Sequence, residues 1–351
     1  MAQARPAKVN CPGINQIAIV VKDLEAVAES YWNILGIGPW TIFNWEAPLV
    51  YDRKYRGKPV LAKERIALAQ VGKVQLELLQ PLEGPSIYAD WLAQRGEGLH
   101  HLNFLVDDVD EVAATLEAEG FPSLQSGRYG LAGLQGAFNY IDIKPLRTIW
   151  EPVHPGEKAG VQPVMFPDIK GGSPAKVQCT GINQVAIVVK DLEAVAESYW
   201  NILGIGPWAI FNWEAPLVYD RKYHGRQALA RERIALTQVG NVQLELLQPV
   251  EGPSIYADWL AERGEGLHHI NFLVDDVDAV ARTLEAQGFP SLQCGRYGPP
   301  DRQGAFNYFD IEPLRTIWEP VHPGEKAGVQ PVMFPQAALG SRPAQRDAGR
   351  Q

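Results

Sequence analysis

The chain has 351 residues, of which 46% are hydrophobic and 21% are charged, and its formal net charge at pH 7 is -9. This length allows about two domains of ordinary size, and the composition excludes a chain that is disordered throughout. The negative charge argues against nucleic acid or an acidic membrane surface as a partner, because both bind basic proteins.

The first residues and the cysteines favour a cytoplasmic protein. The start, MAQARPAKVNCPG, has no apolar signal core, and no run approaches the roughly 20 apolar residues that span a bilayer. The three cysteines, Cys11, Cys179 and Cys294, include no CxxC pair, which fits a reducing compartment. We therefore expect a cytoplasmic location and no membrane partner.

A tandem repeat fills most of the chain. The segment GINQIAIVVKDLEAVAESYWNILGIGPW begins at Gly13 and recurs almost unchanged from Gly181, and the match extends to Pro167 and Pro335. The constant offset of about 168 residues indicates a duplicated domain. We predict an N-terminal arm, a first domain, a flexible linker rich in Gly, Ser and Pro, a second domain and a disordered tail, at 1–12, 13–167, 168–180, 181–335 and 336–351.

The first half of each copy predicts a strand, a helix and three more strands. The apolar, β-branched run at 15–21 is typical of a strand. Asp23 can cap a helix, and Gly36 is placed to end it. Further strands are expected at 40–45, 65–70 and 73–79.

The same pattern then restarts. The run HHLNFLV at 100–106 predicts a strand, and VDEVAATLEAEG predicts a helix from Val109 that ends at Gly120. Three strand candidates follow, near 122–125, 137–143 and 148–153. Each copy therefore holds two βαβββ units, which indicates an α+β fold with paired βαβββ modules and mixed sheets.

Four strands in each copy carry polar residues inside apolar runs. A strand buries alternate residues, so each of these is costly without a partner. Taken singly, a Gln or Glu on a short strand more often faces solvent. Taken together, two carboxylates, an amide and an imidazole meeting in one cleft would suit a divalent metal. They are Gln16, Glu77, His100, His101 and Glu151, with Gln184, Glu245, His268, His269 and Glu319 in the second copy.

The stretches NQIAIVVKDLEAV, VQLELLQP, GEGLHHLNFLVDDVD and FNYIDIKPLRTIWEPV resemble the vicinal oxygen chelate superfamily of glyoxalases, bleomycin resistance proteins and dioxygenases. Within it, they are most similar to methylmalonyl-CoA epimerase and glyoxalase I. The resemblance implies a cupped metal site with ligands on strands one, four, five and eight. Carried onto this chain, the ligands are Gln16, Glu77, His101 and Glu151, and Gln184, Glu245, His269 and Glu319.

Two adjacent histidines compete for one ligand position, and the first strand carries a glutamine. His101 is preferred to His100 because the family's ligand directly precedes the aliphatic residue of the strand, and His100 is then expected to point to the other face. Many members have His where this chain has Gln16, and the resulting set looks like that of eukaryotic glyoxalase I. Ring-cleaving dioxygenases need two imidazoles and one carboxylate around iron, so they are disfavoured. One divalent ion per repeat is expected, from Zn, Co, Ni, Mn or Mg.

Such a site implies proton movement next to a carbonyl, with the metal stabilising the enolate. We therefore predict a metal-dependent isomerase, either an epimerase or a racemase. A carboxylate beside the metal would take and return the proton, whereas the amide of Gln16 cannot titrate. The candidate bases are Glu151, Glu77, Glu319 and Glu245.

The expected substrate is a small carbonyl compound, either aromatic or an acyl-CoA. Aromatic residues after the first helix either line its pocket or belong to the core. Asn103 and Asn271 are in phase with the ligand histidines and are expected to face the same cleft. The basic run at 51–58 would hold an anionic group or form a solvated loop, and HPGEKAGVQPVMFP would form a lid or brace the domain. The aromatic candidates are Trp40, Trp45 and Tyr51, with Trp208, Trp213 and Tyr219.

Several alternatives remain open at this stage. A lyase or ring-opening enzyme, including one like glyoxalase I, would use the same enolate chemistry. A metal-free protein would sequester an aromatic small molecule in the same cup. Each site forms within one repeat or across the two, and the chain is either a monomer or a homodimer.

Overall fold

The computed structural model describes residues 7–131, 133–156, 163–166, 173–326 and 330–335. The predicted disordered tail lies outside these residues. The first repeat contributes three helices, α1 (Leu24–Leu35), α2 (Ile87–Arg95) and α3 (Val109–Ala118). Its strands are β1 (Gln16–Val20), β2 (Trp40–Trp45), β3 (Val50–Tyr55), β4 (Lys58–Pro59), β5 (Lys63–Val71), β6 (Val74–Glu83), β7 (Gly98–Leu105), β8 (Ser123–Tyr129), β9 (Gly136–Ile143), β10 (Thr148–His154) and β11 (Val164–Phe166).

The second repeat follows the same plan. Its helices are α4 (Leu192–Leu203), α5 (Ile255–Glu262) and α6 (Val277–Glu285). Its strands are β12 (Ile182–Val188), β13 (Trp208–Trp213), β14 (Val218–Tyr223), β15 (Arg226–Gln227), β16 (Arg231–Val239), β17 (Val242–Glu251), β18 (Gly266–Leu273), β19 (Ser291–Tyr297), β20 (Gly304–Ile311), β21 (Thr316–His322) and β22 (Val332–Phe334).

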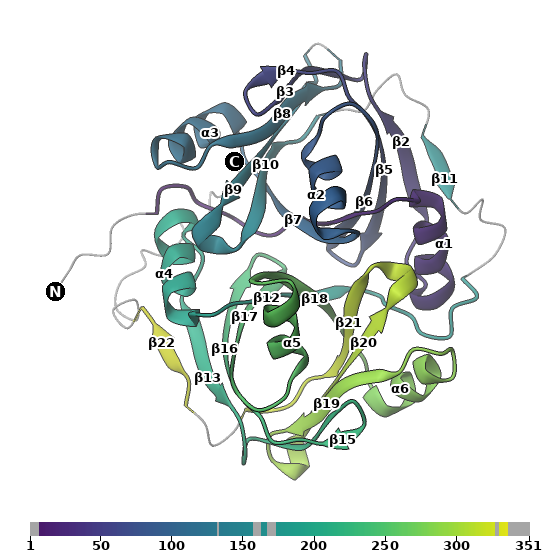
Figure 1. The fold of residues 1–351 in the computed structure, drawn as a ribbon, viewed down its shortest axis with the longest axis vertical. Helices are drawn as coiled ribbons and strands as arrows, with labels where there is room; N and C mark the ends of the chain where they lie inside the picture. Colours follow the sequence, from purple (N-terminus) through teal and green to yellow (C-terminus); the bar gives the residue numbers. More distant parts are fainter. Residues whose placement is uncertain (1–6, 132, 157–162, 167–172, 327–329, 336–351) are drawn as a thin grey trace, which may run out of the picture.

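Each repeat builds one 11-stranded mixed sheet entirely from its own strands. In the first repeat the order is β11-β2-β5-β6-β1-β7-β10-β9-β8-β3-β4, and each sheet curves around a helix, α2 or α5 (Figure 1). The two predicted βαβββ units are present, with β1 and β7 side by side at the centre. The α+β fold of paired modules is therefore confirmed, and the central strands β6, β1, β7 and β10 all come from one copy.

The helix predicted after the first strand forms as expected. The Asp23 side chain accepts a hydrogen bond from the backbone N–H of Ala26, and Gly36 ends the helix with a φ of 67°. A left-handed residue at this position favours glycine, which has no Cβ to clash. The buried face of α1 then packs in the core.

Four elements of the first repeat, α2, β3, β4 and β11, were not expected from the sequence. Helix α2 follows Ser86, whose side chain caps it by accepting from the N–H of Ala89. The basic run expected as a loop at 51–58 instead forms part of β3 and the turn to β4, and β3 pairs with β8.

The two repeats share one hydrophobic core. Helix α1 lies beside β20 and β21 of the second repeat, and α4 lies beside β9 and β10 of the first (Figure 1). The Tyr31 hydroxyl of α1 donates to the Leu314 carbonyl at 2.9 Å, and the Tyr199 hydroxyl of α4 donates to the Leu146 carbonyl at 3.0 Å. The contact is therefore reciprocal.

The arm and the linker make equivalent contacts with opposite repeats. The Cys11 N–H donates to the Leu203 carbonyl at 3.0 Å, and the Cys179 N–H donates to the Leu35 carbonyl at 2.8 Å. The described part of the linker is therefore packed against α1, in contrast to the flexible linker that its composition suggests. None of the described helices is long and apolar enough to cross a membrane.

Candidate active site

One face of the first sheet forms a cup with a cavity of about 160 Å³. The polar side chains that line it come from the central strands, and aromatic side chains surround them. The polar residues are Asn15, Gln16, Gln75, Glu77, Asn103 and Glu151, and the aromatic residues are Trp45, Tyr88, Tyr129, Phe138 and Tyr140.

Strand register brings the predicted ligands together. In the sheet, Ala18 of β1 is the neighbour of both Glu77 on β6 and His101 on β7. Asn103 on β7 is the neighbour of both Gln16 and Glu151. The ligand candidates therefore occupy four adjacent strands of one sheet, so the candidates of each repeat come together within that repeat.

The histidine lies between the two carboxylates. His101 Nε2 is 3.3 Å from Glu151 Oε2 and 3.5 Å from Glu77 Oε2, and the His101 ring is fully buried. Ligand atoms about 2.1 Å from one ion lie about 3 Å apart, so these separations are close to those of neighbouring ligands. In the second repeat, the corresponding distances from His269 are 3.3 Å and 3.6 Å.

Hydrogen bonds orient the remaining polar groups. The Gln16 amide donates to Gln75 Oε1 at 2.8 Å, which leaves the Gln16 carbonyl oxygen available as an acceptor. The Asn103 amide donates to Glu151 Oε2 at 2.9 Å. Asn103 therefore faces the cup as expected, and in this structure it supports a carboxylate.

Burial and charge set the protonation of the cup. Burial disfavours the charged form of His101, but hydrogen bonds and charge from Glu151 and Glu77 outweigh it and raise its pKa to about 9. In the second repeat, burial and the nearby charge of Glu319 raise the pKa of Glu245 well above its ordinary value, while Lys326 acts in the opposite direction. The two buried carboxylates of each cup repel each other, and a cation between them would relieve that repulsion.

The segment after β21 places a lysine over the cup of the second repeat. The Lys326 ammonium lies 5.2 Å from the ring centre of Tyr297, 5.7 Å from that of Phe211 and 5.9 Å from that of Trp213. Burial lowers its pKa, although Glu245 and Glu319 act to raise it. Of the predicted lid, Lys326 therefore covers part of this cup, and β22 braces the domain because it pairs with β13, while 327–329 lie outside the described residues.

The expected position of His100 is wrong. A β-bulge between β1 and β7 inserts His100 as an extra residue, since Ile19 pairs with Leu99 and Ala18 pairs with His101. Alternation of faces is broken at this point. His100 therefore contacts His101 and the side chains of α2 instead of facing the opposite side.

The predicted substrate-binding aromatic residues are divided between two faces. Trp45 lines the cup, and Trp213 belongs to the equivalent cluster. Trp40 and Trp208 are wholly buried in the shared core, which excludes contact with a substrate. The reason is parity: positions 40 and 45 differ by an odd number, so one strand points them to opposite faces.

Tyr51 and Tyr219 also lie outside the cups. Neither belongs to the residues that line the first cup or to the aromatic clusters beneath the cups. The Tyr219 hydroxyl instead accepts a hydrogen bond from the Gln303 amide at 2.6 Å. Four further residues at the cups, Gln75, Tyr88, Tyr140 and Lys326, were not predicted from the sequence. Two-residue spacing from Glu77 along β6 could have identified Gln75, but tertiary packing alone places the others.

The donor set fits a divalent ion of borderline or hard character. Two carboxylates, an amide oxygen and an imidazole meet these preferences, and no thiolate is present in the cup. Within the described ranges, no group of three or more His, Cys, Asp or Glu side chains forms a preformed metal site. Binding would therefore draw the glutamates and His101 slightly closer together.

Known proteins resemble this chain in sequence and in fold. The chain is 33% identical to human mitochondrial methylmalonyl-CoA epimerase over 124 residues, which is 34% of this chain and 62% of that protein. It is 32% identical over 115 residues to an ethylmalonyl-CoA/methylmalonyl-CoA epimerase of Cereibacter sphaeroides, covering 32% of this chain and 75% of the relative. A mutant of 4-hydroxymandelate synthase from Streptomyces coelicolor has a similar fold, with a TM-score of 0.60 and 16% identity over 92% of this chain and 95% of that one.

The matches fall on both copies. The sequence profile of the glyoxalase/bleomycin resistance protein/dioxygenase superfamily fits residues 15–138 and again residues 183–306, together more than half of the chain. These ranges contain three of the four ligand strands of each cup. The chain therefore belongs to the glyoxalase/bleomycin resistance protein/dioxygenase superfamily, as two tandem copies of its domain.

Proposed function

We propose that each repeat is a metal-dependent epimerase or racemase that moves a proton next to a carbonyl, with an acyl-CoA as the substrate class. The observation that carries the proposal is the position of His101 between Glu77 and Glu151 at the base of an aromatic cup. The names of the relatives support the reaction and the acyl-CoA class.

The proposed ion would be held by Gln16, Glu77, His101 and Glu151, and by their equivalents in the second repeat. When bound, a divalent ion supplies Lewis acidity to the substrate carbonyl. The chain's own groups then handle the proton. Glu151 is held in place by the Asn103 amide, and it takes the proton from the carbon beside the carbonyl.

The surrounding side chains keep water from the reacting carbon. Glu77 is within reach of the same centre, and we assign it the return of the proton on the other face. Trp45, Tyr129 and Phe138 form a hydrophobic wall against which the acyl part of the substrate packs. The donor set has one imidazole, so it does not support iron-dependent ring cleavage, which uses two.

The test separates metal binding from proton transfer. We expect the double variant Glu151→Gln and Glu319→Gln to retain divalent metal, measured by elemental analysis, because an amide oxygen can still coordinate. Exchange of the α-proton of methylmalonyl-CoA in deuterated water should fall by about 100-fold to 10,000-fold, since an amide cannot act as a base.

The control is the pair Tyr51→Phe and Tyr219→Phe, which lie outside the cups and should exchange at the wild-type rate. Undiminished exchange in the glutamate variant would remove the assignment of the base. Deuterium incorporation accompanied by an elimination product would favour a lyase, and a protein that binds no divalent metal would favour sequestration.

A further inference from the structure

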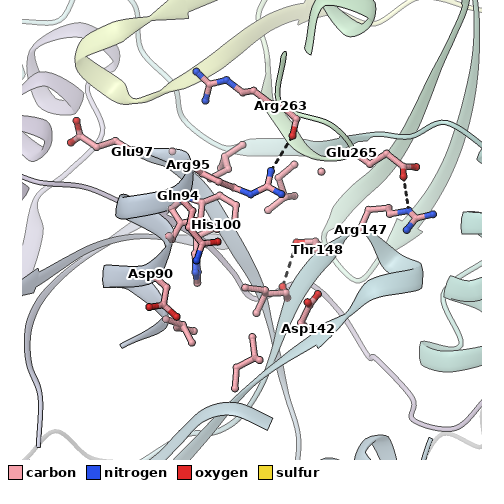
Figure 2. A pocket seen from close by; sticks show the side chains of 18 of the residues that line it. Asp90, Gln94, Arg95, Glu97, His100, Asp142, Arg147, Thr148, Arg263 and Glu265 are labelled. Atoms are coloured by element: carbon pink, nitrogen blue, oxygen red, sulfur yellow. Dashed lines mark hydrogen bonds and ion pairs between the residues drawn. The ribbon is translucent and has the colours of Figure 1, made fainter. Parts of the chain in front are cut away.

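His100 and His268 are buried histidines that the proposed reaction does not use. His100 is 1% exposed, and its ring lies against Tyr88 at 5.5 Å and Trp91 at 4.9 Å between ring centres. His100 also lines a cavity of about 620 Å³ between the repeats. Figure 2 shows His100 near Arg95 in this cavity. Its Nε2 has no hydrogen-bond partner among the described residues.

The one hydrogen bond of the His100 ring in the described structure joins it to the ligand histidine. His100 Nδ1 lies 2.9 Å from His101 Nδ1, with the ring planes at 86°. The second repeat has the same distance and angle between His268 and His269. The β-bulge creates this geometry, because adjacent residues of a regular strand point to opposite faces.

The direction of this bond follows from chemistry. Two nitrogens 2.9 Å apart cannot both carry a proton on the shared line, so one must accept. His101 directs its Nε2 at Glu151 and Glu77. A histidine that coordinates through Nε2 keeps its proton on Nδ1, and a partner that accepts this proton fixes the tautomer and the ring.

We propose that His100 and His268 are positioning residues, each accepting the Nδ1–H of the neighbouring ligand histidine so that its Nε2 faces the two glutamates. The inference rests on the proposed metal site. A neutral His100 suits this role, because only the neutral ring has an acceptor nitrogen, and the ring is enclosed by the aromatic side chains of Tyr88 and Trp91. In such sites the acceptor is usually a carboxylate, a carbonyl or water, so an imidazole is a distinct solution.

The experiment compares an acceptor with an apolar side chain at the same positions. Asn places an oxygen near the site of Nδ1, whereas Leu fills the space without accepting. We expect Zn²⁺ affinity to fall by about 10-fold to 100-fold in the double variant His100→Leu and His268→Leu. The double variant His100→Asn and His268→Asn should stay within about threefold of wild type, since it keeps the acceptor. Circular dichroism and thermal unfolding check that each variant is folded.

The single variant His100→Leu provides an internal control. Its second repeat is unchanged, so Zn²⁺ titration should show one site of wild-type affinity and one weakened site. Equal affinity of Leu and wild-type proteins, or an equal loss in the Leu and Asn variants, would overturn the inference.

Nitrogen-15 spectra of the imidazoles test the bond without any metal. His100 should show an unprotonated Nδ1 and a protonated Nε2, and the reverse would also overturn the inference. If wild-type protein binds no Zn²⁺, the proposed function fails, while these spectra still decide whether His100 accepts from His101.

Discussion

The three cysteines differ in how far solvent reaches them. Cys11 and Cys179 are buried, and burial raises the pKa of each thiol to about 12. Cys294 is only partly buried, and this burial also raises its pKa, while Lys222 and Arg296 act to lower it. The thiolate is the reactive form, so a raised pKa lowers reactivity at neutral pH.

We therefore expect iodoacetamide to label Cys294 alone in the folded protein, faster at pH 9 than at pH 7. At pH 8, a thiol with a pKa of about 12 is ionised to only about 1 part in 10,000. Peptide mass spectrometry after timed quenching measures each site, and unfolded protein is the control in which all three react. Comparable labelling of Cys11 in the folded protein would contradict the described burial.

At the scale of single residues, the sequence located the ligand candidates better than their surroundings. The ligand candidates interrupt apolar runs, so the sequence alone marks them as polar groups that burial would penalise. They are Gln16, Glu77, His101 and Glu151. Lys326 is not visible in this way, because its place depends on the path of the chain after the last long strand.

At the scale of elements, helix α1 depends on its ends as well as on its apolar face. Asp23 satisfies a backbone N–H of the first turn that has no partner within the helix. We expect Asp23→Ala to lower the free energy of unfolding by about 1 kcal/mol, because that N–H loses its acceptor. Urea denaturation measures the change.

Exposed Glu29 on the same helix supplies the control, and Glu29→Ala should change stability by less than about 0.5 kcal/mol. Equal effects of the two substitutions would mean that the cap contributes nothing beyond the change in side chain.

Helices and strands with a clear periodicity of apolar residues were predictable from the sequence, and elements shaped by tertiary contacts were not. The periodicity of α1 and α3 and the apolar runs of β1, β6 and β7 identified the paired modules. Helix α2 buries only Ile87 and Tyr88, so it has little amphipathic signal. The bulge at His100 has no signature in the sequence, because it depends on register with β1.

At the scale of the whole molecule, the repeats are joined as a symmetric pair. The arm around Cys11 packs on α4, and the homologous segment around Cys179 packs on α1. Tyr31 and Tyr199 make the reciprocal contacts of an interface in which the same surface serves both partners.

We therefore expect a chain of residues 1–170 to form a homodimer, because alone it would expose the core surface that now covers the second repeat. Light scattering coupled to size-exclusion chromatography gives the mass, with the full chain as the reference. A folded monomer at micromolar concentration would show that the interface is dispensable.

The hydrophobic interior is common to both halves, but each cup belongs to one half. The effect of a mutation therefore depends on whether it lies in the interior or at a cup. A substitution in the interior affects the stability of both halves, whereas a substitution at a cup or its rim affects only the half that carries it. The two copies already differ at one turn: Arg56 forms an ion pair with Asp90 at 2.8 Å, while the corresponding His224 packs edge-on against Tyr223, with ring centres 4.3 Å apart. The duplicated chain can thus evolve a second specificity while the first is preserved.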